Sequence, residues 1–199
     1  MSVTEVVIIA NVGANIASLR FALERLGASS RVTADLDQIR NASHVILPGV
    51  GAAADAMRRL HEHNLHTLIP SLRQPVLGIC LGMQLLFEAS DEGQTECLGI
   101  IPGRADRFDA SVGRPVPHMG WNTLNIERPS AFLDGLAQND YAYFVHSYAL
   151  KLSEATVASS DYGKPFSACV NWHNFYGVQF HPERSAKVGA RLLQNFLRL

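Results

Sequence analysis

The amino-acid sequence predicts an α/β fold with an open, mostly parallel, twisted sheet and helices on both faces. Three observations support this prediction. Short β-branched runs alternate with stretches of helical periodicity through the first half of the chain, and this alternation is typical of parallel sheets with crossover helices. Several of the runs end in glycine-containing turns. The composition, with 47% hydrophobic and 18% charged residues among 199, is that of a globular chain able to bury a large core.

The first half supplies the elements of this sheet in alternation. In the first predicted helix, Ile16, Leu19, Leu23 and Leu26 recur at helical spacing, and Gly27 is suited to end it. The predicted elements, in chain order, are a strand at Val6–Ala10, a helix at Ile16–Gly27, strands at Ser30–Ala34 and His44–Gly51, a helix at Ala52–Leu65, a strand at Gln74–Cys80 and a helix at Gly82–Ser90.

The second half has short apolar segments, many turn residues and no long helical pattern until its end. We expect antiparallel strands and loops beside the first half, at Leu98–Gly103, Tyr141–Leu150, Phe166–Trp172 and Tyr176–Phe180. The closing segment has Val188, Leu192 and Phe196 on one face, which predicts a helix docked on the sheet. We see no linker or repeat, so we expect a single domain over residues 1–199.

Charge and cysteine content argue against several classes of protein. The formal net charge is -1, which gives no electrostatic footprint for nucleic acid or an acidic membrane. The chain has 3 cysteines without close pairing, as expected of a reduced cytoplasmic protein. The N-terminal residues lack the pattern of a signal peptide, and no apolar run is long enough to span a membrane.

Cys80 lies at a predicted corner between a buried strand and a helix. The stretch Gly78–Gly82 follows the logic of a G-x-S-x-G nucleophile elbow, with cysteine in place of serine. Glycines suit the flanks because a sharp strand-to-helix turn crowds the backbone. The helix N-terminus favours a thiolate, and the Leu81 N–H is placed to stabilise an oxyanion. The alternative is a small cysteine packed in a core strand.

His181 is the best candidate for the base that a thiolate nucleophile needs. It follows the predicted strand Tyr176–Phe180, and Glu183 is close enough to orient its imidazole. The alternative is a surface turn before the last helix. A third element is the loop Leu47–Ala53, whose Pro-Gly-x-Gly sequence can present N–H groups to an anion. It has neither the lysine of a Walker loop nor the glycine spacing of a dinucleotide site.

Three strings together, PGVG, GICLGMQ and GVQFHPE, resemble the class I, triad-type glutamine amidotransferases, which have a flavodoxin-like fold. Cys80 precedes His181 and Glu183 in the order of that family. PGVGA, PHMGWN (Pro117–Asn122) and YFVHSY (Tyr143–Tyr148) further resemble the glutaminase subunits of imidazole glycerol phosphate synthases, over essentially the whole chain.

The resemblance implies a mechanism and a set of roles. Cys80 attacks the side-chain amide of glutamine with the help of His181 and Glu183, ammonia leaves, and water hydrolyses the glutamyl thioester. The implied oxyanion groups are Val50, Gly51 and Leu81, and the implied substrate contacts are Gly49, Gln84, His146, Ser147 and Tyr148. No cofactor and no metal are implied.

The resemblance also implies a partner, the (β/α)₈ cyclase subunit of imidazole glycerol phosphate synthase, as a heterodimer. Ammonia would pass to it for the synthesis of imidazole glycerol phosphate and an aminoimidazole carboxamide ribotide in histidine biosynthesis, and its binding would activate the glutaminase. Candidate interface residues are Asn15, Trp121, Asn122, Tyr143 and Arg184, the last standing where the family commonly has lysine. Core or rim packing is the alternative for Trp121, Asn122 and Tyr143.

Other functions remain open from sequence. The chain could serve another synthase, such as pyridoxal phosphate or anthranilate synthase, although PHMGWN and FVHSY favour the first interpretation. A non-catalytic scaffold of the same fold and a redox-sensing cysteine are alternatives from other classes, the second weakened by the absence of a nearby resolving cysteine. The histidines at 61, 63 and 66 form a run that we interpret as a solvated helix end rather than a metal site.

Overall fold

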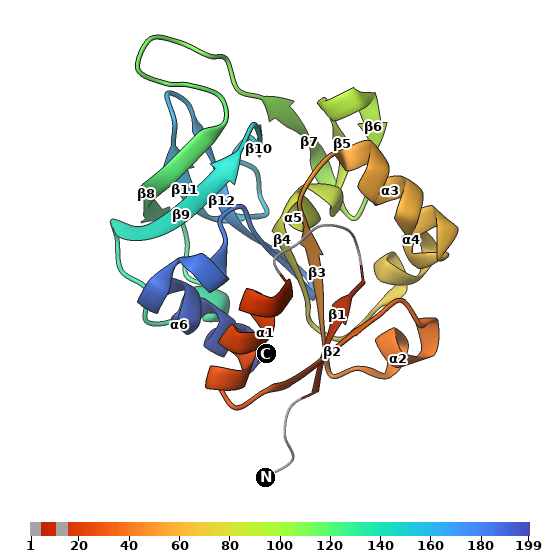
Figure 1. Ribbon diagram of the computed structural model, residues 1–199. Helices are drawn as coiled ribbons and strands as arrows, with labels where there is room; N and C mark the ends of the chain where they lie inside the picture. The colour runs from red at the N-terminus through yellow and green to blue at the C-terminus, as the bar shows by residue number, and fades with distance from the viewer. Residues whose placement is uncertain (1–4, 11–15) are drawn as a thin grey trace.

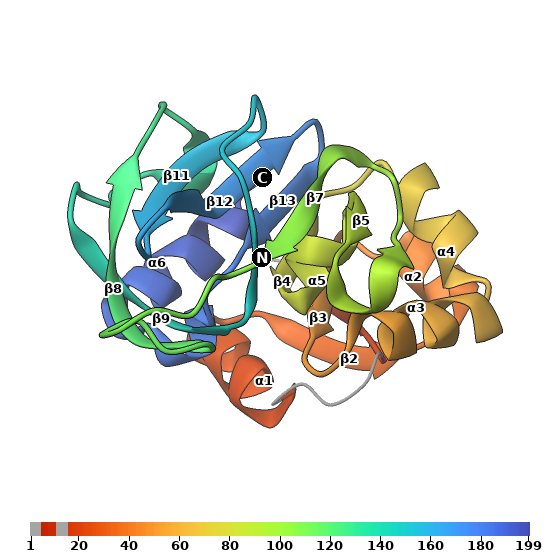
Figure 2. The same ribbon diagram turned by 90° about the horizontal axis from the view of Figure 1, so that it is seen from above.

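The structure is a computed structural model that describes residues 5–10 and 16–199. Its main sheet has the strand order β2-β1-β3-β4-β13-β12-β11-β8-β9 within these residues (Figures 1 and 2). The strands, in that order, are Ser29–Thr33, Glu5–Ile9, His44–Gly49, Val76–Cys80, Phe175–Val178, Pro165–Trp172, Thr156–Asp161, His118–Ile126 and Asp140–His146. A smaller sheet, β10-β7-β5-β6, consists of Tyr148–Leu150, Ile101–Arg107, Phe87–Ser90 and Thr95–Glu96.

Helices cover both faces of the main sheet, which confirms the predicted fold class. The helices are α1 (Ile16–Arg25), α2 (Leu36–Asn41), α3 (Ala53–Glu62), α4 (Leu65–Leu68), α5 (Leu81–Leu85) and α6 (Ala186–Phe196). On β1, Val6 and Ile8 pack in the same core cluster as residues of α1 and α6, whereas Val7 and Ile9 pack with residues of α2, α3 and α4. Figures 1 and 2 show these two groups of helices on opposite sides of β1 and β3.

Alternation along β1 explains how one strand serves two cores. Successive side chains of a strand point to opposite faces, and here both faces are covered, so the apolar run is continuous rather than alternating. The last helix was predicted correctly: Leu192 and Phe196 of α6 are fully buried, and Val188 packs against the same cluster.

The predicted helix at Gly82–Ser90 is wrong in its second half. Helix α5 ends at Leu85, and β5 begins at Phe87. The carbonyls of Leu85 and Leu86 accept hydrogen bonds from the N–H groups of Leu98 and Ile100, at 2.9 and 3.0 Å. Because those carbonyls are taken by a later segment, they cannot hold a further helical turn, and the chain turns into the small sheet instead.

The prediction of antiparallel strands in the second half is correct for most of them but only half correct for Tyr176–Phe180, because β13 pairs antiparallel with β12 and parallel with β4. Strands β8, β9, β11 and β12 pair antiparallel, as expected. Strand β13, however, lies in the middle of the main sheet and runs parallel to β4, with Gly177 opposite Gly78. Strand Leu98–Gly103 contributes to β7, which pairs parallel with β5.

Helix α2 was not predicted from the sequence, although it carries a recognisable start. Asp35 accepts a hydrogen bond from Gln38 N at 2.8 Å, the geometry of a side-chain N-cap. In the described part of the chain, no helix has the length and apolar character needed to cross a membrane.

Candidate active site

Cys80 occupies a strained turn between β4 and α5. Its backbone φ of 54° lies in the left-handed region, with ψ at -112°, and a non-glycine residue adopts such angles only where the surroundings impose them. A Cβ on Gly82 would lie 1.8 Å from Leu47 O, and one on Gly78 would lie 2.7 Å from Gly82 O. The glycines are therefore required by the close approach of α5 to the strands, as the sequence predicted for a nucleophile elbow.

The end of β3, where the Pro-Gly-x-Gly loop begins, packs directly on this elbow. A Cβ on Gly49 would lie 2.8 Å from Gly82 N and 3.0 Å from the Leu81 Cβ. Gly49 is buried, and it is not among the residues that line the pocket at Cys80. Its position is consistent with close packing of the loop, while its predicted contact with substrate stays a prediction.

His181 and Glu183 lie beside Cys80 because β13 and β4 are parallel neighbours and end at the same edge of the sheet. His181 Nδ1 lies 2.9 Å from Glu183 Oε1. Strand β9 holds the turn: His181 N donates to Tyr143 O at 3.0 Å, and Tyr143 N donates to Ser185 Oγ at 3.0 Å. The imidazole is thus fixed through both its ring and its backbone.

The surroundings of His181 favour its protonated form. Burial alone would lower its pKa, but hydrogen bonds and charge interactions with Cys80 and Glu183 outweigh burial and raise the pKa to about 10. Since Nδ1 faces Glu183, Nε2 is the ring nitrogen left for the Cys80 sulfur. The ring is thus placed between the proposed nucleophile and a carboxylate.

A pocket of about 310 Å³ opens at Cys80. It is lined by Val50, Gly51, Cys80, Leu81, Gln84, Glu92, Pro117, Val145, His146, Ser147, Tyr148 and His181. The structure therefore brings together at one pocket the predicted nucleophile and base, the three predicted oxyanion residues and all predicted substrate contacts except Gly49. Glu183 stands behind His181 rather than in the pocket lining.

Gln84 uses its amide nitrogen within the protein. Its Nε2 donates to Tyr148 O at 3.0 Å and to Gln179 Oε1 at 2.9 Å. The two amide hydrogens are thereby occupied. Only the carbonyl oxygen of Gln84 is left to meet a ligand in the pocket, so this residue can accept a hydrogen bond there but not donate one.

Glu92 lines the pocket and was not predicted from the sequence. Its Oε2 accepts a hydrogen bond from the N–H of Ala53 at 2.7 Å. Ala53 is the first residue of α3 and follows the Pro-Gly-x-Gly loop. No side chain at the N-cap position, Ala52, caps this helix. A carboxylate from 39 residues away thus anchors the end of the predicted oxyanion loop.

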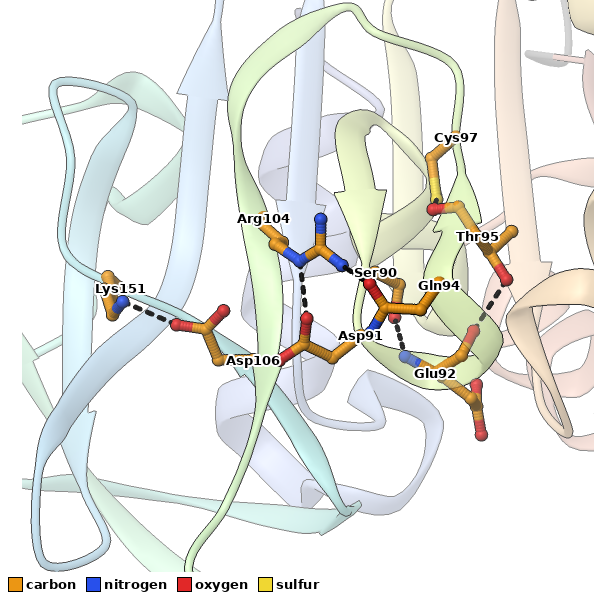
Figure 3. A network of polar contacts seen from close by, with 9 residues as sticks. All are labelled: Ser90, Asp91, Glu92, Gln94, Thr95, Cys97, Arg104, Asp106 and Lys151. Carbon is orange, nitrogen blue, oxygen red and sulfur yellow. Dashed lines mark hydrogen bonds and ion pairs between the residues drawn. The ribbon is translucent and has the colours of Figure 1, made fainter.

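A polar network holds Glu92 in place (Figure 3). Its N–H donates to Ser90 Oγ at 3.1 Å and its carbonyl accepts from Thr95 Oγ1 at 2.6 Å. Arg104 spans the same turn by contacting Asp91 at 2.5 Å and Gln94 at 2.7 Å. No local sequence motif predicts this network around Glu92, because the network forms only where β5, β6 and β7 meet in the small sheet.

Of the candidate interface residues, Trp121 and Tyr143 share one face of the β8–β9 pair, and Asn122 lies on the other. Trp121 and Tyr143 lie opposite each other on β8 and β9, with ring centroids 5.8 Å apart. Trp121 is 53% exposed. Asn122 instead directs its amide inward, to His118 Nε2 at 3.3 Å and Asp161 O at 2.8 Å. Arg184 is exposed. Asn15 lies outside the described residues.

The described residues contain no group of three or more His, Cys, Asp or Glu side chains arranged to hold a metal ion. In the predicted histidine run, the His61 and His66 rings stack on each other with centroids 3.8 Å apart. The other two cysteines have environments that oppose ionisation: burial raises the pKa of Cys97 to about 11 and that of Cys169 further.

Comparison with known families decides the relationship of this site to known enzymes. Residues 7–199 match the family described as glutamine amidotransferase class-I. The chain belongs to the class I glutamine amidotransferase family. Its fold agrees with solved structures at low identity: a putative GMP synthase protein from Thermoplasma acidophilum has a TM-score of 0.77 at 17% identity, with 100% of this chain and 94% of that chain covered.

Curated relatives of this amidotransferase are much closer in sequence. It is 52% identical over 187 residues to imidazole glycerol phosphate synthase subunit HisH 2 of Legionella pneumophila (strain Paris), covering 94% of each chain. It is 51% identical over 194 residues to subunit HisH of Idiomarina loihiensis, covering 98% of this chain and 97% of that protein. These matches bear out the resemblance drawn from the PHMGWN and YFVHSY strings.

Proposed function

We propose that this chain hydrolyses glutamine to glutamate and ammonia as the glutaminase subunit of an imidazole glycerol phosphate synthase. The observation that carries the proposal is that Cys80 and His181 meet at one pocket, with Glu183 behind His181, in a chain about half identical to HisH subunits over nearly its whole length.

In the proposed mechanism, the Cys80 thiolate attacks the side-chain amide carbon of glutamine. The negative charge moves to the amide oxygen, where N–H groups of Leu81 and the Val50–Gly51 loop stabilise it. Protonated His181 then gives its proton to the amide nitrogen, the C–N bond breaks, and ammonia leaves. A water molecule attacks the resulting thioester while His181 accepts its proton, and glutamate is released as Cys80 regains the thiolate.

The pocket lining suggests how glutamine is held. The free carbonyl oxygen of Gln84 accepts a hydrogen bond from the substrate, and Glu92 presents a carboxylate for its α-ammonium group. Because the same carboxylate accepts from Ala53 N, a substrate bound to Glu92 would sit against the segment that anchors the oxyanion loop. His146, Ser147 and Tyr148 also line the pocket and are the proposed contacts for the amino acid group.

A cyclase partner is proposed to receive the ammonia. Exposed apolar side chains on one face of β8 and β9, Met119, Trp121 and Tyr141, are 64%, 53% and 58% exposed. Neighbouring exposed apolar side chains mark a candidate protein-binding surface, and Tyr143 on the same face holds the His181 backbone. Docking on this face would therefore act on the segment that positions the base.

Glutamate release from glutamine tests the proposal, measured with and without a cyclase subunit of imidazole glycerol phosphate synthase and its nucleotide ligand. We expect strong stimulation by the liganded cyclase and no activity in Cys80→Ala. Activity that does not change when the cyclase is added would support the glutaminase activity but contradict the proposed partner. No activity from a complex shown to form would favour a non-catalytic scaffold.

A further inference from the structure

A buried pair of amide side chains outside the triad reaches the proposed nucleophile, with one of the two in contact with its sulfur. Gln179 Nε2 lies 3.7 Å from Cys80 Sγ, and Gln179 Oε1 accepts from Gln84 Nε2 at 2.9 Å. Gln179 is fully buried, and Gln84 is 4% exposed. Buried amides keep the orientation that satisfies their hydrogen bonds, because an unpaired buried polar group is costly.

The direction of this pair is set by an atom that cannot change its role. Tyr148 O is a backbone carbonyl and can only accept, so Gln84 must turn its nitrogen toward it. The second hydrogen of that nitrogen then meets Gln179 Oε1. Gln179 is left with its nitrogen, a donor, facing the sulfur.

The same carbonyl is fixed from a second side. His146 Nδ1 also lies 2.8 Å from Tyr148 O, and burial of His146 lowers its pKa to about 3, so the ring is neutral and Nδ1 carries its hydrogen. Reversal of Gln84 would place its oxygen against this carbonyl and against Gln179 Oε1. The structure thus opposes any orientation that would turn an oxygen toward Cys80.

We propose that Gln179 is a further catalytic residue: its N–H, oriented by Gln84 and the Tyr148 carbonyl, donates to the Cys80 thiolate and favours its ionised form. A hydrogen bond to the charged form of an acid favours ionisation. Gln179 does not line the pocket, so it acts on the nucleophile without touching glutamine. The inference rests on the proposed function, in which Cys80 is the nucleophile.

Alkylation of Cys80 by iodoacetamide across a range of pH tests this role in the full chain, with the Cys80 peptide followed by mass spectrometry. The isosteric change Gln179→Glu places an oxygen where the donor stands. We expect the alkylation rate at neutral pH to fall about tenfold, and the midpoint of its pH profile to rise by about one unit. Gln179→Met, which removes the donor without adding charge, moves the profile in the same direction by less.

A change at Gln84 tests whether the orientation of the Gln179 amide, and not only its presence, affects Cys80. In Gln84→Glu, the new carboxylate can only accept, so Gln179 turns its nitrogen toward residue 84 and its oxygen toward the sulfur. We expect slower alkylation, because residue 84 acts on Cys80 Sγ through the orientation of Gln179. Gln84→Met leaves Gln179 free to turn either way, and we expect an intermediate rate.

A matched control removes a buried amide elsewhere. Asn195 is 3% exposed and donates to Phe132 O and Asp134 O. We expect Asn195→Leu to lower stability but leave the alkylation profile unchanged. In turnover with the cyclase, Gln179→Met should lower kcat and leave KM close to that of the wild type, since residue 179 does not line the pocket.

An unchanged alkylation profile in folded Gln179→Met would overturn the proposal, as would an equal shift in Asn195→Leu. If Gln179→Glu fails to fold, Gln179→Met decides. Alkylation requires neither glutamine nor cyclase. Failure of the proposed function, seen as absent glutamate release in the wild type, is therefore distinguishable from failure of this inference.

Discussion

Two neighbouring histidine sites in this molecule have opposite proton affinities. The pKa of His181 is raised to about 10, whereas the pKa values of His146 and His118 are lowered to about 3 and about 4. Burial acts in the same direction on all three. The difference comes from the partners: His181 contacts a thiol and a carboxylate, while His146 contacts a backbone carbonyl and another histidine.

His118 and His146 form the neutral pair, and their hydrogen bonds support this difference independently of the pKa values. Thr123 N donates to Asn122 Oδ1, so Asn122 turns its nitrogen to His118 Nε2, which must accept. His118 Nδ1 then donates to His146 Nε2 at 3.0 Å, and His146 Nδ1 donates to Tyr148 O. A proton added to either ring would place two donors against each other. Partners, more than burial, therefore decide which histidine can act as an acid–base group.

Of the changes considered, Cys80→Ala is expected to have the largest effect on activity and on the difference in pKa between His181 and the neutral pair. Glutamate release should fall by at least about three orders of magnitude, because the nucleophile is lost. Cys80 is also one of the two groups that raise the pKa of His181, so that pKa should fall while those of His118 and His146 stay low. NMR titration of the histidine rings measures both. An unchanged His181 titration would contradict the assigned partner.

Glu183→Gln removes the second partner while keeping its shape. The amide can still accept a hydrogen bond from His181 Nδ1 but no longer supplies charge, so the pKa of His181 should fall. We expect glutamate release to drop by about two to four orders of magnitude. Steady-state kinetics with the liganded cyclase measure this. Circular dichroism of the variant controls for loss of fold, and near-wild-type activity would contradict the role of the carboxylate.

The neutral histidine pair predicts sensitivity of stability to acid. A histidine with a lowered folded-state pKa stays neutral while the unfolded chain takes up a proton below about pH 6.5, so the stability that it contributes is lost as pH falls toward about 4. Between pH 7 and pH 5, the free energy of unfolding of the wild-type protein should fall by about 1–2 kcal/mol more than that of His118→Gln. Urea unfolding at the two pH values measures it, and equal losses would contradict the neutral state of His118.

Asn122→Asp is expected to have the smallest effect, confined to the neutral pair. The change replaces the donor that faces His118 Nε2 with an acceptor, so Nε2 should gain a proton and the pKa of His118 should rise. Nitrogen chemical shifts of the ring report the tautomer. Asn122→Ala, which removes the donor without adding an acceptor, is the control. A ring that keeps its original tautomer in Asn122→Asp would contradict the hydrogen-bond direction assigned above.

Much of the site was predictable because it depends on strand ends. Cys80 ends one apolar run and His181 follows another, and the active sites of such α/β sheets lie beyond the carboxyl ends of the strands. The elbow glycines were predictable for a local reason, the crowding of a strand-to-helix turn. The parallel pairing of β13 with β4 was not, since a short apolar run carries no sign of its direction.

The parts that sequence could not supply depend on long-range contacts between polar side chains. Glu92 reaches Ala53 across 39 residues, and Gln84 reaches Gln179 across 95. Glu92 lies in a turn directly after Gly82–Ser90, where a helix was wrongly predicted, so the small sheet around this turn was not predicted. Gln179 stood inside a predicted strand, where alternation gave no reason to single it out. The small sheet and the central position of β13 create both contacts.

Trapping the glutamyl thioester tests the central claim most directly. Wild-type protein with the liganded cyclase is quenched in acid during turnover of isotope-labelled glutamine, digested and analysed by mass spectrometry. We expect one labelled glutamyl group on the Cys80 peptide and none in Cys80→Ala. A label on another residue, or sustained glutamate release by Cys80→Ala, would contradict it.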